Sequence, residues 1–337
     1  MLLKKSLFLS LLFVLLLTIS CRTADGTMAE KKTIADHYGL IHVKGNKIVD
    51  KDENPVALHG MSLFWSQWGG KFYNKNCIQW LRDDWRCTVI RAACGVGKDG
   101  YLDNPEEEFT KVKTVVDACI ALGIYVIVDW HDHNAENHLE QSKTFFKKIA
   151  LQYGNTPNII YEIYNEPLRV SWSEVVKPYA ESVIKVIRQY DHDNLIIVGT
   201  PMWSQDVDSA ALSPVTDTNV AYAYHFYTSE KWHKQGLRDK AIAALQNGAA
   251  LFVTEYGISE ASGAGKIDDE ETGRWLSFVD SLKLSSCNWS IIDKDETSAA
   301  LKPGADSTGS WSEHDLSESG KFIRNRIRTM DRSILNK

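Results

Sequence analysis

The sequence predicts an α/β protein of the (β/α)8 TIM barrel class, built as a single domain with a short N-terminal hairpin. Eight short apolar runs recur along the chain, and each is followed by a longer segment. With 337 residues, of which 44% are hydrophobic, the chain is long enough to bury the core of one large barrel. It contains no internal repeat, low-complexity tract or linker to a second domain.

The eight apolar runs are the expected barrel strands, because parallel strands need long crossover connections between them. In chain order they are residues 56–63, 87–92, 124–130, 159–164, 195–199, 220–225, 250–255 and 287–292. Helical spacing predicts helices over residues 104–122, 142–152, 172–190 and 319–330. Gly123 follows the first of these helices as a typical stop signal. Residues 41–43 and 47–49 flank Gly45-Asn46, which predicts a tight hairpin ahead of the first strand.

The first 20 residues are typical of an export signal. Lys4 and Lys5 precede an apolar run over residues 6–19, which is short for a membrane span. The run Leu17-Thr18-Ile19-Ser20-Cys21 resembles a bacterial lipobox, in which the cysteine becomes the lipidated first residue, with Thr18 standing where leucine is usual. We therefore expect a lipoprotein. An ordinary cleaved signal, with Cys21 present by chance, is the alternative.

These features divide the chain into three expected segments. Residues 1–20 are a lipoprotein signal peptide, residues 21–36 are a flexible tether of polar and small residues, and residues 37–330 form the barrel domain. The protein would be exported and anchored to a membrane of the cell envelope through a lipid on Cys21, facing the periplasm or the cell surface. An ordinary signal peptide would give a secreted protein instead. No later segment is long and apolar enough for a membrane helix.

The charge and the cysteines limit the classes of partner. A net charge of −6 disfavours nucleic acid, because phosphate binding needs a basic face. We expect a monomer. Five cysteines follow Cys21, and an odd number in an exported protein leaves at least one free thiol. No Cys-x-x-Cys pair supports a zinc or redox site, Cys87, Cys119 and Cys287 are expected in the core, and a Cys77–Cys87 disulfide stays open.

Polar residues gather where the expected strands end. They are Arg91, His131, Asn165 with Glu166, His225 with Tyr227, and Glu255, together with Trp289 inside the last strand. In barrels of this class the carboxyl ends of the strands carry the active site. One polar residue at a strand end is usually a solvated cap, but six strands that share this pattern are hard to explain as caps.

Glu166 follows the fourth expected strand and Glu255 ends the seventh, and these two strands lie across the barrel mouth from each other. Two facing carboxyl groups can cleave a glycosidic bond. One is protonated and donates its proton to the leaving oxygen, and the other is ionised and attacks the anomeric carbon. Taken singly, Glu166 could belong to a structural turn and Glu255 to a buried ion pair. Eleven tryptophans also suit a cleft that binds sugar rings.

The sequence resembles glycoside hydrolase family 5, within the large clan of retaining glycosidases, and most closely its bacterial endoglucanase branch. The resemblance covers roughly residues 38–328 and rests on motifs in the same order and spacing. They are residues 59–68, Val128-Asp129-Trp130-His131, Asn165-Glu166-Pro167, Tyr224-His225-Phe226-Tyr227, Thr254-Glu255-Tyr256-Gly257, Asn288-Trp289-Ser290, residues 293–296 and residues 299–305. The resemblance implies that residues 37–330 are a glycoside hydrolase catalytic domain.

The resemblance also implies a role for each matching residue. Glu166 would be the general acid/base and Glu255 the nucleophile. Arg91 and Tyr227 would hydrogen-bond the nucleophile, His225 would lie beside the acid, and Asn165 would bind the sugar 2-hydroxyl. His131 would contact the sugar at the cleavage point, and Trp289, joined to Ser290 by a cis bond, would form its floor.

Further residues would bind more distant sugars. The resemblance places Lys294 and Glu296 on the non-reducing side. Trp65, Trp68 and Trp203 are candidate stacking platforms, with core packing as their alternative. The run Ala93-Cys94-Gly95 departs from the branch, which usually has an aromatic residue there. A stacking contact on the non-reducing side is therefore either missing or supplied by Tyr101.

The implied activity is endo-acting hydrolysis of β-1,4-glucosidic bonds in cellulose or related β-glucans, by double displacement with retention and without cofactor or metal. Mannan, xylan or mixed-linkage glucan are alternative substrates. A non-catalytic glycan-binding lipoprotein is a further alternative, although a binding protein has no need of both glutamates. A metal-dependent hydrolase would instead use His131 and His133 as ligands.

Overall fold

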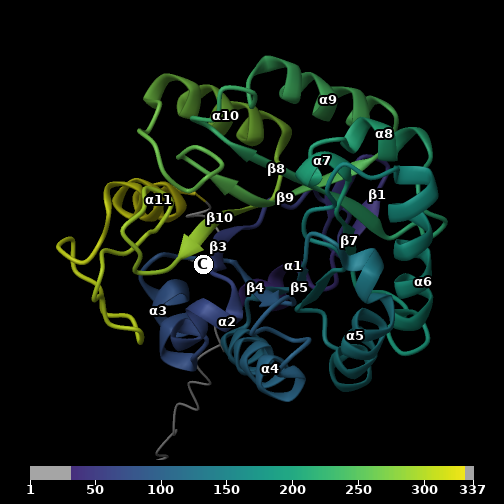
Figure 1. Ribbon diagram of the computed structural model, residues 1–337, viewed down its shortest axis with the longest axis horizontal. Helices are drawn as coiled ribbons and strands as arrows, with labels where there is room; N and C mark the ends of the chain where they lie inside the picture. The colour runs from purple at the N-terminus through teal and green to yellow at the C-terminus, as the bar shows by residue number, and fades with distance from the viewer. Residues whose placement is uncertain (1–31, 331–337) are drawn as a thin grey trace, which may run out of the picture. The chain divides into compact units, whose positions relative to one another are not determined.

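Eight parallel strands close into a barrel in this computed structural model, which describes residues 32–330. Around the barrel their order is β10-β3-β4-β5-β6-β7-β8-β9. The strands are β3 (His59–Leu63), β4 (Val89–Gly95), β5 (Tyr125–His131), β6 (Ile159–Glu162), β7 (Ile196–Val198), β8 (Val220–Tyr227), β9 (Ala250–Gly257) and β10 (Ser286–Ile291). Every position of these strands is buried, as expected for a sheet covered on both faces. The predicted barrel class is confirmed (Figure 1).

Helices surround the barrel on its outside (Figure 1). The longer ones are α3 (Lys75–Asp83), α4 (Pro105–Leu122), α5 (Leu139–Tyr153), α6 (Lys177–Ile187), α9 (Gln235–Gln246), α10 (Asp269–Leu282) and α11 (Glu318–Thr329). The shorter ones are α2 (Ser66–Gly69), α7 (Pro201–Ser204) and α8 (Val207–Leu212), with single turns at Gly70–Phe72, Ala135–His138 and Trp172–Val176. Helix α4 starts with Pro105 and three acidic residues and ends at Gly123, whose φ is +66°, so the predicted stop is confirmed.

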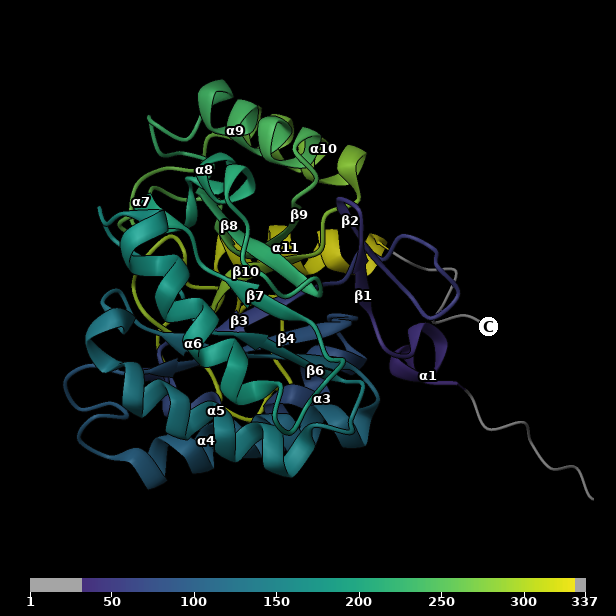
Figure 2. The ribbon, with the colours of Figure 1, turned by 90° about the vertical axis from the view of Figure 1, so that its right-hand side faces the viewer.

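The N-terminal hairpin lies at the end of the barrel where the strands begin (Figure 2). Strand β1 (His42–Lys44) pairs antiparallel with β2 (Lys47–Val49), as predicted. The backbone N–H of Val43 donates to Asn219, directly before β8, and the Asn46 side chain donates to the carbonyl of Leu245, ahead of β9. These contacts hold the hairpin against the amino-terminal end and leave the carboxyl ends of the strands open.

The folded domain starts earlier in the chain than the sequence suggested. Thr33 caps helix α1 (Ile34–Tyr38) with a reciprocal bond to Asp36, and Ile34 and Ala35 are buried. Residues 33–36, expected in the flexible tether, therefore belong to the fold because this helix has an apolar face to bury. The predicted signal peptide and Cys21 lie outside the described residues. Within residues 32–330 no helix is long and apolar enough to cross a membrane.

Five cysteines lie in the described part of the chain, and all are buried as free thiols. They are Cys77, Cys87, Cys94, Cys119 and Cys287. The prediction that Cys87, Cys119 and Cys287 are core residues is confirmed, and Cys77 and Cys87 do not form a disulfide. Burial raises the pKa of each of these thiols. They therefore pack as small apolar side chains.

Candidate active site

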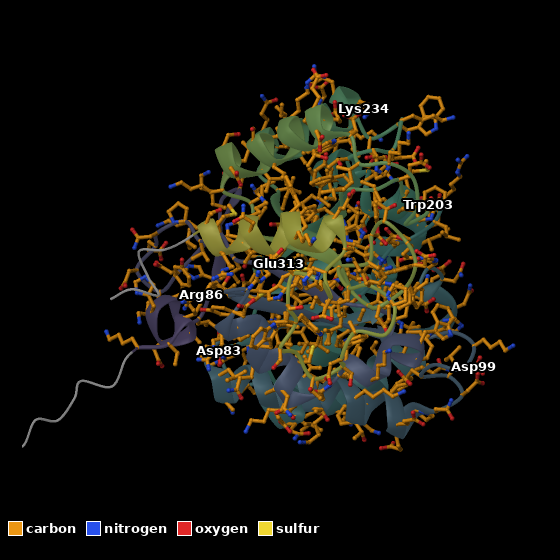
Figure 3. All side chains as sticks on the ribbon, turned by 90° about the vertical axis from the view of Figure 1, so that its left-hand side faces the viewer. Asp83, Arg86, Asp99, Trp203, Lys234 and Glu313 are labelled. Carbon is orange, nitrogen blue, oxygen red and sulfur yellow. The ribbon has the colours of Figure 1, made fainter. Side chains whose placement is uncertain are left out.

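A cavity of about 650 Å³ opens at the carboxyl ends of the barrel strands. Figure 3 shows the two ends of the domain, with Trp203, Lys234 and Asp99 toward one and Asp83 and Arg86 toward the other. Most of the predicted site residues line this cavity: Trp65, His131, Glu166, Trp203, His225, Tyr227, Glu255, Trp289, Lys294 and Glu296. Arg91 and Asn165 are buried and contact this set through hydrogen bonds.

Arg91, on β4, is the centre of a buried polar network. Its guanidinium donates to Glu162 over 2.7 Å, to Glu255 over 2.8 Å and to the Asn165 side-chain oxygen over 2.6 Å. Asp129 is a third carboxylate partner at 3.0 Å. Burial works against the Arg91 charge, but the three carboxylates outweigh it and hold the pKa of Arg91 above its usual value. One fully buried cation on β4 therefore fixes groups from three other strands or their ends, β5, β6 and β9.

Glu255, on β9, is held on both of its carboxyl oxygens. Arg91 donates to Oε2 over 2.8 Å, and the Tyr227 hydroxyl donates to Oε1 over 2.7 Å. Burial and the neighbouring Glu166 carboxylate raise the pKa of Glu255, and Arg91, His225 and Tyr227 oppose that rise. These donors orient the carboxylate and stabilise its ionised form.

Glu166 lies between two histidines, in the segment that follows β6. His225 Nδ1 is 2.9 Å from Oε1, and His133 Nε2 is 3.2 Å from Oε2. Burial raises the pKa of Glu166, but the hydrogen bonds and charges of His133 and His225 outweigh burial and bring this pKa down to about 2. Burial lowers the pKa of His225, yet hydrogen bonds to Glu162 and Glu166 bring it to about 9. At neutral pH the proton between Glu166 and His225 therefore lies on His225.

A continuous chain of hydrogen bonds joins the two glutamates. From Glu166 it passes through His225 to the Thr254 hydroxyl, 2.8 Å from Nε2, and Thr254 donates to Glu162 over 2.6 Å. Glu162 accepts from Arg91, which donates to Glu255. The charge of each glutamate is thus linked to that of the other through buried groups.

Trp289 and His131 lie side by side in the lining of the cavity. Their rings stack at 5.1 Å with 5° between the planes, and His131 Nδ1 is 2.6 Å from Asp129. The bond between Trp289 and Ser290 is cis, as expected. Burial lowers the pKa of His131, which favours its neutral ring, and Nδ1 of that ring shares a hydrogen bond with Asp129.

Aromatic and charged residues lie at the two sides of the cavity. Trp65, after β3, contacts His131 edge-on at 4.1 Å, and Trp68 packs on Trp65 at 5.4 Å with 59% of its surface exposed. Trp68 is therefore beside the cavity and does not line it. On the side that follows β10, Lys294 pairs with Glu296 over 2.5 Å.

Trp203 lies after β7, in a turn whose three residues Met202, Trp203 and Ser204 all have φ between 56° and 59°. This left-handed backbone is unfavourable for residues other than glycine. Backbone hydrogen bonds from Met202 to Leu168 and from Trp203 to Pro167 hold it, and Ser204 Oγ donates to the carbonyl of Asn165 over 2.7 Å. The Trp203 loop is thus fastened to the segment that carries Glu166.

The expectation for Tyr101 is wrong. Only 4% of its surface is exposed, and its ring packs edge-on against Trp130 and Phe145 behind β5. Tyr101 cannot supply the stacking contact that is missing at Cys94-Gly95, because it belongs to the layer between the barrel and the helices.

Sequence reasoning missed several residues of the network. It weighed His133 only as a metal ligand, yet His133 contacts Glu166, whereas its supposed partner His131 contacts Asp129. These separate contacts do not support a shared ion between the two histidines. Asp129 and Glu162 were missed as partners of Arg91. The signal for them was a charged residue in each of two otherwise apolar strands, where an inward-facing charge needs a partner.

A closed barrel whose mouth presents two opposed glutamates is the arrangement of a glycoside hydrolase. One carboxyl oxygen of Glu166, one of Glu255 and a ring nitrogen of His225 lie within 4.8 Å of one another. Comparison with known proteins agrees with this class. The model of the family "Cellulase (glycosyl hydrolase family 5)" matches residues 49–295.

The chain belongs to glycosyl hydrolase family 5. It is 43% identical to endoglucanase Z of Dickeya dadantii over 97% of this chain and 73% of that protein. It is 49% identical to endoglucanase A of Evansella cellulosilytica over 82% of this chain and 57% of that protein. The chain thus spans a little over half to about three quarters of these two relatives.

Solved structures share the fold closely. A structure from Cytophaga hutchinsonii is 53% identical, with a TM-score of 0.87 over 88% of this chain and 97% of that one. The catalytic domain of Thermobifida fusca endoglucanase Cel5A is 34% identical, with a TM-score of 0.84 over 88% of this chain and all of that domain. A variant of the same Thermobifida domain has been solved in complex with cellotetraose, and its TM-score is 0.83.

Proposed function

We propose that this protein is a retaining endo-β-1,4-glucanase that acts on cellulose or related β-glucans. The arrangement of Glu166 and Glu255 carries the proposal, since their nearest carboxyl oxygens lie within 4.8 Å. Retaining enzymes hold their carboxyl groups about 5–5.5 Å apart, whereas inverting enzymes need about 6.5–9.5 Å. The endoglucanase relatives and the cellotetraose complex support the choice of substrate.

In the first step Glu255 attacks the anomeric carbon and forms a bond to it, while the bond to the leaving oxygen breaks. Glu166 gives its proton to that oxygen. In the second step water attacks the same carbon, Glu166 takes a proton from the water, and Glu255 leaves. Arg91 and Tyr227 keep Glu255 placed and ionised throughout. Trp289 and His131 form the floor under the reacting sugar, and Asn165 binds its 2-hydroxyl.

The free site stores the acid proton on His225, since Glu166 is ionised beside a cationic imidazole. When substrate binds, the leaving-group oxygen lies against Glu166. This oxygen is uncharged and does not stabilise the ionised carboxylate, so the protonated form of Glu166 becomes more favourable. The proton then moves over the 2.9 Å contact from His225 Nδ1 to Glu166 Oε1 and on to the leaving oxygen. After water attack it returns by the same route.

Digestion of a panel of soluble β-glycans tests the substrate class. We expect mid-length products from β-1,4-glucan, retention of anomeric configuration by NMR, and activity that survives exhaustive chelation. Faster cleavage of mannan, xylan or mixed-linkage glucan would replace the substrate. Binding without products would indicate a glycan-binding protein, and loss with EDTA that one divalent ion restores would indicate a metal enzyme.

Matched glutamine variants test the two roles. Glu166→Gln and Glu255→Gln should each lose on the order of 10³-fold or more in turnover of cello-oligosaccharides while staying folded. Glu166→Gln should still be glycosylated by a substrate with an activated leaving group, because that bond breaks without a proton. Glu255→Gln should not. Exposed Glu174→Gln is the control, and more than a tenth of normal turnover in either site variant would refute the assignment.

We further propose that the protein is a monomer held to a membrane of the cell envelope through lipidated Cys21. The signal-like first 20 residues and the lipobox-like run support the anchor. Cys21→Ser should move the protein from the membrane fraction to soluble material without a change in specific activity. A wild type that is already soluble would contradict the anchor, and a dimer mass by light scattering would contradict the monomer.

A further inference from the structure

Trp232 is a large side chain that the fold exposes at the catalytic cleft. It lies between β8 and α9, lines the same cavity as the two glutamates, and keeps 76% of its surface exposed. Exposing an indole ring to water costs free energy that burial elsewhere would recover. A ring displayed beside a polysaccharide cleft therefore needs an explanation other than core packing.

The segment that carries Trp232 is firmly attached to the barrel. The next residue, His233, is buried, and its Nδ1 accepts from the backbone N–H of Tyr227 over 2.8 Å. The Trp275 indole donates to the His233 carbonyl, also over 2.8 Å, and Lys234 Nζ donates to the carbonyl of Thr228. His233 thus anchors the loop from below, so Trp232 is presented from a fixed base.

The position of Trp232 in the barrel order indicates which sugars it can reach. Strand β8, which precedes it, neighbours β7, which precedes Trp203. Three strands separate β7 from β3 in either direction round the barrel, so Trp203 and Trp65 lie on opposite sides of the mouth. The acid Glu166 follows β6, next to β7, and the leaving group lies beside the acid. Trp203 and Trp232 are therefore on the leaving-group side.

We propose that Trp232 forms a distal subsite that stacks on a glucosyl ring of the leaving-group part of the chain, beyond Trp203. The inference rests on the proposed endoglucanase function. An indole ring offers flat apolar area to the C–H face of an uncharged pyranose. Glu230, which also lines the cavity at this end, offers carboxylate oxygens to the hydroxyls at the ring edge.

Kinetics on substrates of two lengths test the subsite. With cellohexaose, Trp232→Ala should lower kcat/KM roughly tenfold, which corresponds to about 1.4 kcal/mol. Trp232→Phe keeps a flat ring and should lose no more than about threefold. With an aryl cellobioside, whose small leaving group ends before Trp232, all variants should stay within about twofold of the wild type. With end-labelled cellohexaose, Trp232→Ala should also make fewer of the cuts that leave long reducing-side products than the wild type does.

Leu212→Ala is the matched control, because Leu212 is equally exposed at 76% but does not line the cavity. An unchanged kcat/KM and cleavage pattern for Trp232→Ala on cellohexaose would overturn the subsite. So would an equal loss on the aryl cellobioside, since that indicates a disturbed catalytic centre. A wild type that does not cleave cellohexaose at all would instead overturn the proposed function, so the two failures are distinguishable.

Discussion

Arg91 shows how much of this site depends on one side chain. It is fully buried, and its planar fork reaches Glu162, Glu255 and Asn165 at once, with Asp129 also in contact. A lysine carries the same charge but offers a single nitrogen, which cannot span these acceptors. Placement of the nucleophile thus follows from guanidinium geometry as much as from charge.

Arg91→Lys should therefore lower both stability and activity. We expect a loss of about 1.5–3 kcal/mol in the free energy of unfolding, the value for a hydrogen bond to a charged group. The loss in kcat/KM should be on the order of 10²-fold, since a donor to the reacting carboxylate is lost. Urea unfolding and steady-state kinetics measure the two. Arg188→Lys, which breaks a partly buried fork to Asp217, should lose stability alone, and full activity in Arg91→Lys would contradict the argument.

The titrating residues predict the shape of the pH profile of kcat/KM, which reports the free enzyme. Glu166 and His225 share one proton, and the pKa of His225 is about 9, so activity should fall as the pH rises through about 9. Glu255 must be ionised, and its pKa is raised by burial, so activity should also fall on the acid side, above the usual range of a glutamate. An activated aryl substrate needs no proton and should lose the alkaline limb.

His133 provides a direct test of that assignment. Its ring nitrogen hydrogen-bonds Glu166 and favours the ionised carboxylate. His133→Phe removes this donor, so Glu166 and His225 should hold their shared proton more tightly and the alkaline limb should move to higher pH. Exposed His314→Phe is the control. An alkaline limb that stays in place or moves to lower pH would contradict the role of His133.

At the scale of elements, two glycines differ in the space that the fold leaves for a side chain. Gly60 of β3 pairs with Val89 of β4, and a Cβ at Gly60 would lie 1.7 Å from the Val89 carbonyl oxygen. Gly273 is inside helix α10, and a Cβ added there would meet no atom within 4 Å. The barrel strand therefore needs glycine for close approach, whereas the helix merely tolerates it.

Alanine substitutions at these glycines should have opposite effects on stability. Gly60→Ala should lower the free energy of unfolding by about 2–3 kcal/mol, because the obstacle is backbone that cannot rotate away. Gly273→Ala should raise it by about 0.5–1 kcal/mol, since alanine is the better helix former. Both are measured by urea unfolding. Equal effects in the two variants would contradict the packing argument.

Most elements could be predicted from the sequence because both faces of a parallel barrel strand are buried, which leaves a continuous apolar run. The first and last residues of the strands were predicted less accurately than the strands themselves. The first run was expected from residue 56, but β3 starts at His59, and β8 extends to Tyr227 past the expected end at residue 225. Strand ends depend on the register of neighbouring strands, which local composition does not encode.

Site residues that belong to a local sequence motif could be predicted, whereas hydrogen-bond partners far apart in the sequence could not. Glu166 lies shortly after β6 and Glu255 lies near the end of β9, each beside distinctive neighbours, so their motifs stand out. The Glu162 contact to Arg91 spans 71 residues, and the His225 contact to Thr254 spans 29. Such pairs exist only once the barrel closes. Tyr101 shows the converse error, since its proximity in sequence to Cys94 said nothing about the side of β5 on which it packs.

At the scale of the whole molecule, the two ends of the barrel have different tasks. The hairpin and helix α1 lie at the end where the strands begin, whereas the polar network and the cavity lie at the carboxyl ends. Figure 3 shows these two ends: Arg86, shortly before β4, lies toward one, and Trp203 and Lys234 lie toward the other. Changes to the hairpin should therefore affect stability, and changes at the mouth should affect catalysis.

The reaction of the five buried thiols with a thiol reagent can be used to measure how often the fold opens. All are hidden in the fold, and burial keeps them protonated, so an alkylating or disulfide reagent can react only with molecules that have opened. In a Cys21→Ser background, the labelling rate under native conditions should track the opening equilibrium and match the free energy from urea. Rapid labelling of a folded sample would contradict this burial.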